Sequence, residues 1–512
     1  MEGYMSDSLF QVEQNAILQD MQHFVKNGAL NLEIHKVEES LFRSLLRLGK
    51  ALLQEAIENH GSGKVEGKIS NGEEDLPYHS MKSNSYLSIF GEIKYLRAYY
   101  WTNNCTRGVH PLDAKLNMPE SKYSYFLGSL LNRGVADQTY EEVLENYNDF
   151  FGINIPKKSL EDIAISAGKE FDKYVISKES LDQTTEGNII CIQADCKGIR
   201  MVASEKPDVG KTEAVGANFK KGKGEKDGLR KMAVATGDYS FNPQPRTPEE
   251  LIEALMKEKT VKDREKEKEI EKELKRKLKE NGEIAPGEPM NVQVSATLAG
   301  KSIAFSGLVN RILQRDPTKS KPIVALMDGE KSLESELIAS LDKAGQKDRL
   351  DCIILDVIHM IEYLWKAGTS LYGEKGKARL SWVRTQGLSI LKGNVGRVIG
   401  ALRQILIKKD LKKSTQKVLN SVITYFMNHK HMMKYNEYLE KGYPIATGFI
   451  EGTCGSLIRD RTDKSGSRWT SVGVQSVLNL RAAIKNGWWN GYYEFHIEKQ
   501  SVKLYGPRKK AS

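Results

Sequence analysis

Two apolar stretches of the sequence end on an aspartate: "NIICIQAD" at Asn188–Asp195 and "PIVALMD" at Pro322–Asp328. Short runs of isoleucine, valine and leucine indicate buried strands, and neighbouring strands of a mixed sheet bring their ends to one edge. Two carboxylates there repel each other unless a cation lies between them, and Mg²⁺ takes carboxylate oxygens as ligands. The pair therefore indicates a divalent-metal site, although either aspartate alone would indicate no more than the start of a polar turn.

A third acid would complete a site for two metal ions. Glu451 stands in "PIATGFIEGTCG", where small residues permit close approach of the backbone. The stretch "SLIRDR" that follows offers Arg459 and Arg461 to phosphate. A two-metal site activates an attacking oxygen on one ion and stabilises the leaving oxygen on the other, which suits in-line displacement at a phosphodiester. Glu451 is the best candidate to join Asp195 and Asp328.

The segments around these acids predict an α/β fold. From residue 186, "NIICIQADCKGIRMVAS" and "KMAVATGDYS" predict three strands and "KSIAFSGLVNRILQR" predicts a helix. Next, "KPIVALMDGE" predicts a strand, "SLESELIASLDKAG" a helix, and "LDCIILDVIHMIEYLWKAG" a strand running into a helix. Such alternation implies a mixed sheet covered by helices. The charged stretch Lys257–Asn281 alternates in sign, which favours a solvated helix over direct nucleic-acid binding. Residues 360–440 are predicted to be helical.

The first 180 residues are predicted to be mainly helical. Residues 1–75 show an apolar period close to 3.6 and end in a turn-rich linker. The stretches "YLSIF" and "IKYLRAYYW" then predict a β-hairpin that ends at Trp101. Residues 121–180 return to a helical pattern.

Two short helices are predicted within residues 121–180. Thr139 and Glu142 indicate a capping box at the start of the first, and Ser159 and Asp162 are expected to cap the second. Helices joined in this way form either a DNA-binding helix-turn-helix or an ordinary helical hairpin, and the pattern does not decide between them. In a helix-turn-helix, the neighbouring Lys157 and Lys158 would contact phosphate.

Composition limits the class of protein. The 512 residues carry a formal charge of +10, which favours a polyanionic partner. No apolar run is long enough to span a membrane, and the acidic start of the chain lacks an apolar signal core. The number of cysteines is odd and they are scattered, so no disulfide framework is expected; they are Cys105, Cys191, Cys196, Cys352 and Cys454. We expect a cytoplasmic, nucleoid-associated protein.

Four stretches, taken in order, resemble the DDE transposases of bacterial insertion sequences of the ISKra type. They are "IQADCKGIRM", "ALMDGE", "IILDVIHMIEYLWKAG" and "GYPIATGFIEGTCGSLIRDRTDKSGSRW". The likeness runs from about residue 80 to residue 495 and is weak over the first 75 residues. The last stretch is its most specific part.

The resemblance implies an RNase H-like catalytic domain with a mixed sheet, helices on both faces and an all-helical insertion before the glutamate. Asp195 would be the first acid, on the central strand, Asp328 the second, at the end of a later strand, and Glu451 the third. The three would hold two Mg²⁺ ions, for which Mn²⁺ can substitute, and would nick the element's ends and join them to target DNA. The implied segments are 1–75 (helical), 76–180 (DNA-binding, with the hairpin and the helix-turn-helix), 186–356 (first part of the core), 357–440 (helical insertion) and 441–512 (second part of the core).

Four further positions match features of these transposases. Asp356 and His359, in "LDVIHMIEYLW", lie at the start of the helical insertion, where the histidine could contact the scissile phosphate. Alternatively, Asp356 caps the helix and His359 packs beside Trp365. Arg468 and Trp469 follow the turn "KSGS" and could grip phosphate and stack a flipped base, or Trp469 could pack in the core.

One departure concerns zinc. Relatives often carry a CxxC pair in the stretch that matches "AYYWTNNCTRGVHP", but here Asn103 or Asn104 stands at the first position and Cys105 is left with His110 nearby. One thiolate and one imidazole are too few for a closed tetrahedral site. We therefore predict no structural zinc.

Three functions stay open at this point. The first is an active transposase whose N-terminal region binds terminal inverted repeats, working on double-stranded DNA as a homodimer or higher oligomer. The second is a catalytically inactive DNA-binding protein descended from a transposase, which the three intact acids disfavour. The third is a structure-specific, metal-dependent nuclease of the RNase H-like class. The long helical insertion and the Glu451 stretch favour the first.

Overall fold

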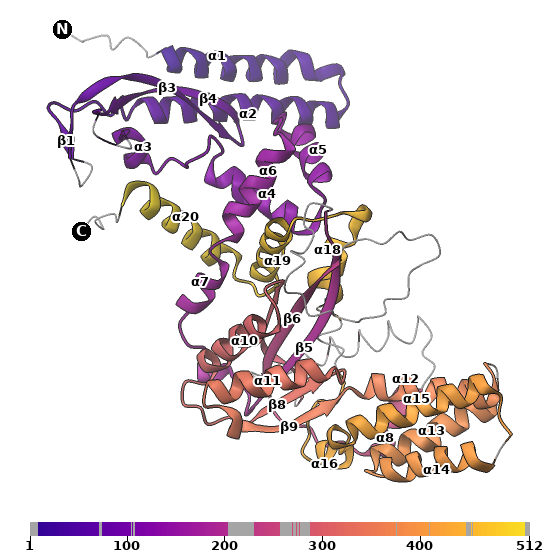
Figure 1. Ribbon diagram of the computed structural model, residues 1–512. Helices are drawn as coiled ribbons and strands as arrows, with labels where there is room; N and C mark the ends of the chain where they lie inside the picture. Colours follow the sequence, from indigo (N-terminus) through magenta and orange to yellow (C-terminus); the bar gives the residue numbers. More distant parts are fainter. Residues whose placement is uncertain are drawn as a thin grey trace, which may run out of the picture. The chain divides into compact units, whose positions relative to one another are not determined.

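A computed structural model describes residues 9–70, 74–103, 105, 108–202, 230–256, 269, 273, 276, 287–374, 376–408, 410–446, 452 and 454–506. The chain forms two compact units (Figure 1). Unit 1 comprises Met1–Glu170 together with Trp488–Ser512, and unit 2 comprises Phe171–Gly487. The charged stretch Lys257–Asn281 lies outside the described residues except for Glu269, Glu273 and Arg276.

Unit 1 combines helices with a long β-hairpin. Its helices are α1 (Leu9–His23), α2 (Ile34–Glu58), α3 (Pro111–Leu116), α4 (Tyr125–Asp137), α5 (Tyr140–Phe151), α6 (Lys157–Gly168) and α20 (Trp489–Tyr505), with short turns at Phe24–Gly28 and Ala29–Asn31. Its strands are β1 (Ile69–Ser70), β2 (Asp75–Leu76), β3 (Tyr78–Ser88) and β4 (Gly91–Tyr100). Helix α20 therefore belongs to unit 1. On sequence alone, the same residues are part of segment 441–512, the expected second part of the core.

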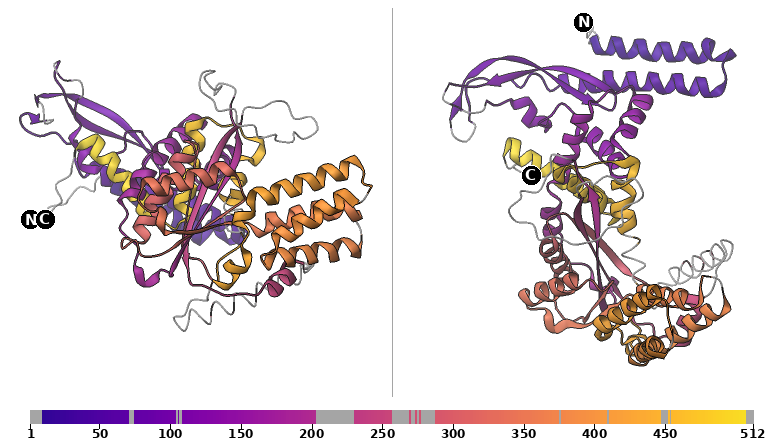
Figure 2. Two further views of the ribbon diagram at one scale, coloured as in Figure 1. Left: turned by 60° about the horizontal axis from the view of Figure 1, so that its bottom comes forward. Right: turned by 45° about the vertical axis from the view of Figure 1, so that its right-hand side comes forward.

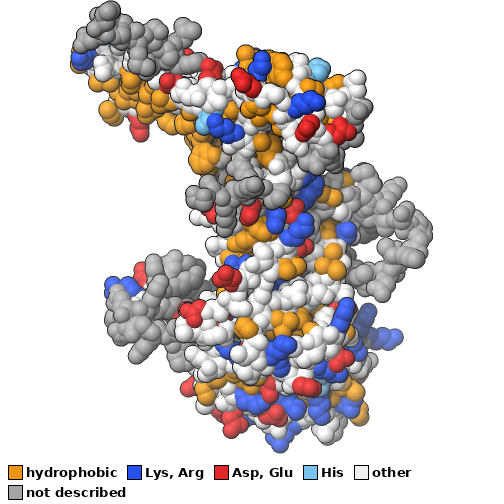
Figure 3. Space-filling view, turned by 90° about the vertical axis from the view of Figure 1, so that its left-hand side faces the viewer, with side chains coloured by type: hydrophobic (Ala, Val, Ile, Leu, Met, Phe, Trp, Pro, Cys, Tyr) orange, Lys and Arg blue, Asp and Glu red, His pale blue; other side chains and the backbone are white. Residues whose placement is uncertain are grey.

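The predicted hairpin is confirmed. Strands β3 and β4 pair antiparallel from Ser88↔Gly91 to Tyr78↔Tyr100, so β3 begins eight residues before the predicted "YLSIF". Ile93 and Tyr95 of β4 are buried against Ile57 of α2. Apolar side chains also remain exposed in unit 1, including Leu45 and Leu52 of α2, and Figure 3 shows such side chains gathered in the upper part of the molecule.

The capping box at α5 is confirmed, because the Thr139 hydroxyl accepts from the Glu142 amide while Glu142 accepts from the Thr139 amide. The predicted cap of the next helix is wrong. Helix α6 begins at Lys157, with Pro156 at the N-cap, so Ser159 and Asp162 lie inside it. The fixed φ of proline suits a helix start, which explains why the helix begins before the polar residues.

Unit 2 is built on a five-stranded mixed sheet in the order β7-β6-β5-β8-β9. The strands are β5 (Ile189–Arg200), β6 (Arg230–Phe241), β7 (Met290–Thr297), β8 (Ile323–Met327) and β9 (Leu350–Leu355). β5, β6 and β7 form an antiparallel meander, whereas β8 pairs parallel with β5 and β9 pairs parallel with β8. The predicted α/β class with a mixed sheet is confirmed. The segments predicted to give three strands give two, because β5 runs unbroken through Gly198.

Helices flank this sheet and extend from it. They are α7 (Phe171–Ser177), α8 (Pro248–Met256), α10 (Lys301–Arg315), α11 (Lys331–Lys343), α12 (Val357–Tyr372), α13 (Lys377–Leu391), α14 (Val395–Lys408), α15 (Lys413–His429), α16 (Tyr435–Glu440), α18 (Asp460–Thr462) and α19 (Ser471–Lys485). Short helical turns lie at Gln183–Thr185, Lys347–Arg349, Lys430–Met432, Cys454–Arg459 and Lys464–Gly466. Helix α10 packs on β6 and β7, and α19 packs on β7.

The helical insertion, residues 357–440, contains α12 to α16, and its long helices lie side by side (Figure 2). Helix α8, which precedes β7 in the sequence, packs on α13 and joins this group. The apolar core continues from the sheet into the insertion through residues such as Leu355, Met360 and Leu364. Across the described residues, no helix is both long and apolar enough to cross a membrane.

A buried ion network ties α10 to the sheet. The Arg315 guanidinium lies 2.8 Å from Glu186 and 3.0 Å from Asp238, and all three side chains are fully buried. Arg311 Nε donates to the other oxygen of Asp238 at 2.6 Å and its Nη2 donates to Thr236. Two cations and two anions therefore compensate each other inside unit 2, which is the condition under which buried charges are tolerated.

Arg315→Met should destabilise unit 2 strongly, because Glu186 and Asp238 would then be buried without their common partner. We expect a loss of about 3–5 kcal/mol in the free energy of unfolding, measured by urea denaturation followed by circular dichroism. Lys347→Met, which breaks an exposed pair with Asp342, is the control and should cost less than about 1 kcal/mol. Equal midpoints for the two variants would contradict this account of the network.

Candidate active site

Asp195 and Asp328 lie at matching positions on neighbouring parallel strands. The β5–β8 ladder pairs Ile190 with Ile323 and continues to Gln193 with Leu326. Asp195 and Asp328 each follow this last pair by two residues, so they stand opposite each other in the same register. Neighbouring strands are about 4.8 Å apart and residues two apart share a face, so the two carboxylates belong to the same face and the same edge. Both residues are partly exposed.

The pKa of the neighbouring Cys196 thiol reflects the charges at this edge of the sheet. Burial, followed by the charge of Glu330, raises the pKa of Cys196 to about 12. The carboxylates of Asp195 and Asp328 act on the Cys196 pKa in the same direction, whereas Lys301 opposes them. The acids of β5 and of the loop after β8 therefore lie close together, and Asp195, Asp328 and Glu330 are named here the acid edge. Like charges about 5 Å apart repel by roughly 3 kcal/mol at an effective dielectric constant of about 20, and a divalent cation would reverse that sign.

Glu330 adds a third carboxylate to the described part of this edge. Burial raises its pKa, but hydrogen bonds from Lys301 and Ser332 outweigh burial and hold the pKa of Glu330 below its ordinary value. Its backbone amide donates to Asp328 Oδ1 at 2.9 Å, which fixes one oxygen of that carboxylate. The turn "DGE" after β8 therefore delivers two acids, and Lys301 of α10 balances one of them.

Helix α15 of the insertion holds the loop that carries Asp328. The Tyr425 hydroxyl donates to the Asp328 carbonyl at 3.0 Å, and His429 Nε2 lies 2.7 Å from the Gly329 carbonyl. His429 Nδ1 lies 2.8 Å from the Tyr425 carbonyl, so the imidazole is fixed on both sides. Tyr425 also stacks on Tyr363 of α12 at 3.7 Å between ring centroids. Gly329 has φ +91°, and a Cβ there would meet the His429 ring, so glycine is required.

Glu451 lies outside the described residues, but described segments on both sides of it contact the start of α12 and strand β5. Before it, the Ile445 carbonyl accepts from the Val357 amide at 2.9 Å, beside Asp356, whose amide donates to the Met327 carbonyl at 2.8 Å. After it, the turn Cys454–Arg459 packs against β5.

Asp356 caps α12, because its carboxylate accepts from the Ile358 amide at 2.9 Å while the residue is fully buried. This supports the capping alternative for Asp356. His359 lies in the first turn of the same helix, with its side chain about one-third exposed, 3.9 Å from Glu362. A role for His359 in phosphate contact stays a prediction.

The arginines after Glu451 differ in accessibility. Arg459 and Arg468 are exposed, but Arg461 is 1% exposed and lies over the Trp469 ring at 4.6 Å. Trp469 is 4% exposed, and its indole nitrogen donates to the Thr462 carbonyl. Its backbone bonds to Arg200 and Val202 extend the end of β5. Both side chains are thus buried in packing, which supports the core alternative for Trp469, and contacts of Arg461 and Trp469 with DNA stay predictions.

The stretch Ala98–Pro111, in which a zinc site was considered, contains Cys105, which is partly exposed, and His110. His110 Nδ1 lies 3.1 Å from the Ala98 carbonyl, and burial, helped by the charge of Arg97, lowers the pKa of His110 to about 4. Within the described parts of the chain, no group of three histidine, cysteine or acidic side chains is arranged to hold a metal ion. Glu451 is not among the residues covered by that statement.

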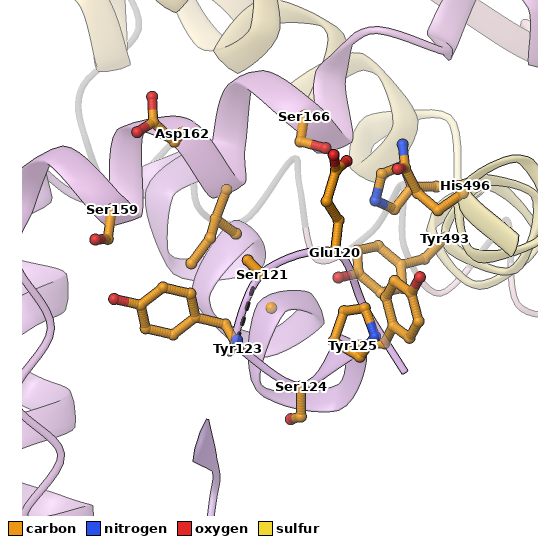
Figure 4. Close-up of a pocket in the computed structure, with 14 residues that line it drawn as sticks. Glu120, Ser121, Tyr123, Ser124, Tyr125, Ser159, Asp162, Ser166, Tyr493 and His496 are labelled. Atoms are coloured by element: carbon orange, nitrogen blue, oxygen red, sulfur yellow. Dashed lines mark hydrogen bonds between the residues drawn. The ribbon is translucent and has the colours of Figure 1, made fainter. Parts of the chain in front are cut away.

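The predicted lysines of unit 1 begin α6, where Lys157 pairs with Glu141 and Lys158 lies 2.9 Å from Asp162. One side of α6 faces a pocket of about 360 Å³ that it shares with α4 and α20 (Figure 4). His496 and Tyr493 of α20 line this pocket together with hydroxyls of α6. The N-terminal turn with the two lysines is therefore the part of α6 most open to solvent. This packing suits the helical-hairpin alternative at least as well as a groove-binding helix.

Sequence reasoning missed the supporting residues of the acid edge. Glu330 stands two residues after Asp328, and this spacing could have identified it. Lys301, Tyr425 and His429 gave no such signal, because each reaches the edge from a helix distant in the sequence. No model of a known protein family matches the chain, and no curated protein matches it either.

Tyr425→Phe should loosen the Asp328 loop without unfolding the insertion, because it removes the donated hydrogen bond and keeps the ring stacked on Tyr363. We expect faster amide hydrogen exchange in the peptide spanning 328–331, by about 5-fold for the removal of a bond of roughly 1 kcal/mol. Tyr363→Phe removes a hydroxyl from the other ring of the same stack and is the matched control. An exchange rate in Tyr425→Phe equal to that of the control would show that α15 does not hold the loop.

Proposed function

We propose that this protein is a DDE-type transposase that cleaves and joins DNA by metal-dependent phosphoryl transfer. The observation that carries the proposal is the shared register of Asp195 and Asp328 on adjacent parallel strands. Asp195 lies on the central strand of the sheet and Asp328 follows a later strand, as the resemblance to transposases of the ISKra type implies. The mixed sheet and the helical insertion after β9 also agree with an RNase H-like catalytic domain.

The donor set suits hard divalent cations. Asp195, Asp328 and, by the resemblance, Glu451 would hold two Mg²⁺ ions, which would supply an activated attacking oxygen and a stabilised leaving oxygen. The chain's own residues prepare this edge. Glu330 fixes one oxygen of Asp328 through its amide, Lys301 keeps Glu330 ionised, and Arg459 and Arg468 are exposed cations in the segment after Glu451. Double-stranded DNA is the proposed substrate, with two protomers or more pairing its ends.

Asp195→Asn should abolish Mg²⁺-dependent nicking of DNA that carries the element's ends while leaving DNA binding unchanged, because it removes a metal ligand and conserves shape. We expect the nicking rate to fall by at least about 1,000-fold, measured on a supercoiled plasmid, with binding measured by fluorescence anisotropy. Asp342→Asn, an equal change of charge at an exposed site on α11, is the control.

The outcomes separate the candidate functions. Nicking without strand transfer to target DNA would favour the structure-specific nuclease. Binding without nicking by the natural sequence, in Mg²⁺ or Mn²⁺, would favour the inactive DNA-binding protein. Loss of both nicking and binding in Asp195→Asn would identify the aspartate as a structural residue.

Replacing Lys157 and Lys158 by glutamine tests the DNA-binding role of α6. Exposed ion pairs contribute little, so phosphate can compete with Glu141 and Asp162 for these lysines. We expect the slope of log K against log salt to fall by up to about 2, near 0.9 for each phosphate that a lysine no longer neutralises. An unchanged slope would place DNA recognition elsewhere in the chain.

A further inference from the structure

The charge of the protein is concentrated in one part of the chain. The helical insertion, residues 357–440, contains 15 lysines and arginines against 5 aspartates and glutamates. The difference of 10 equals the net charge of the whole protein, so the other residues balance to zero. Between Lys377 and His429 the sequence has a single acid, Asp410. The excess therefore belongs to the surface of α13, α14 and α15.

Part of this charge is already neutralised, and part is not. On α13, Arg384 pairs with Glu253 and the following Lys392 pairs with Glu249, both acids belonging to α8. Several exposed cations on the α14–α15 side differ from these, since no ion pair to them is found within the described parts of the chain, and four of them are grouped as one surface. They are Arg403, Lys413, Lys417 and Lys430 and are named here the basic face.

The members of the basic face come from neighbouring helices. Lys413 and Lys417 are four residues apart, so they share one side of α15, away from its buried stripe of Leu419, Val422 and Phe426. Arg403 of α14 reaches Met427 of α15 at 2.8 Å, which brings its charge onto the same helix pair. Lys430 follows α15 directly, and its ammonium lies next to Gly396 at the start of α14.

The basic face also leads to the acid edge. The 17 residues of α15 extend about 25 Å at 1.5 Å per residue. Near the C-terminal end of α15, Tyr425 and His429 contact the loop that carries Asp328. Lys430 of the basic face directly follows His429. A polyanion lying along α14 and α15 would therefore meet the loop of Asp328 at one end of the face.

We infer that the basic face is a binding surface for the backbone of duplex DNA. Duplex DNA carries one negative charge per about 1.7 Å, so a face about 25 Å long spans enough phosphates for all four cations. Such contacts position DNA without reading its sequence. The identification of the polyanion as DNA rests on the proposed function, whereas the surface itself is defined by the charges.

The test measures binding of the full chain to a 30-base-pair duplex of arbitrary sequence, without divalent metal, over a range of salt. The quadruple variant R403Q/K413Q/K417Q/K430Q should lower the slope of log K against log salt by about 3–4 and weaken binding at least about 10-fold near 100 mM salt. The double variant K413Q/K417Q should give about half the change in slope. It keeps the inference testable if the quadruple variant does not fold. Melting temperatures of both should match the natural sequence.

A charge-matched control uses four cations of unit 2 that already have carboxylate partners: Lys347, Arg384, Lys392 and Lys441. Their replacement by glutamine should change the slope by less than about 1. Equal effects in control and basic-face variants would mean that net charge alone matters and would overturn the inference. An unchanged slope in the quadruple variant would also overturn it, as would binding of the natural sequence to phosphatidylserine vesicles but not to the duplex. Binding to this duplex, combined with no nicking of end-carrying DNA in Mg²⁺ or Mn²⁺, would defeat the proposed function and leave this inference standing.

Discussion

The parallel pairing of β5 with β8 is the constraint on which the rest of the structure depends. It joins an antiparallel meander to two parallel strands and brings two aspartates 133 positions apart to one level. The paired stretches are fully buried on both faces of the sheet, with Ile190 and Ile192 on one face and Val324 and Leu326 on the other. A shift of one residue would turn each of these side chains to the opposite face of the sheet. The register that fills the core is therefore the same register that aligns the acids.

The acid edge is supported from three directions. Lys301 comes from the helix before β8, Glu330 from the turn after it, and Tyr425 with His429 from the helical insertion. An aspartate at the end of a strand would otherwise have a mobile side chain and a loop free to shift. Groups that orient a ligand from behind commonly decide how well a metal site works. The insertion is thus part of the site, and α15 connects the acid loop to the basic face.

The buried ion network of unit 2 and the basic face of the insertion differ in how their charges are balanced. The network of Arg311, Arg315, Asp238 and Glu186 is buried and neutral overall, so it fixes how α10 lies on the sheet. Such networks contribute more to a single arrangement of elements than to net stability, because desolvation offsets much of the attraction. The four cations of the basic face are exposed, and no ion pair to them is found within the described parts of the chain, so their charge is available to a partner.

The sequence by itself determined the local elements and identified the side chains that could carry chemistry. Apolar runs ending in Asp195 and Asp328 gave the strands, and Thr139 with Glu142 gave the cap of α5, because these signals act over a few neighbouring residues. Tertiary structure decided what depends on distant contacts. It buried Arg461 and Trp469 against each other and assigned α20 to unit 1. It also brought Tyr425 and His429 about 100 positions back along the chain to the loop after β8. No local pattern encodes such contacts, since they follow from which surfaces are left to be covered once the sheet has formed.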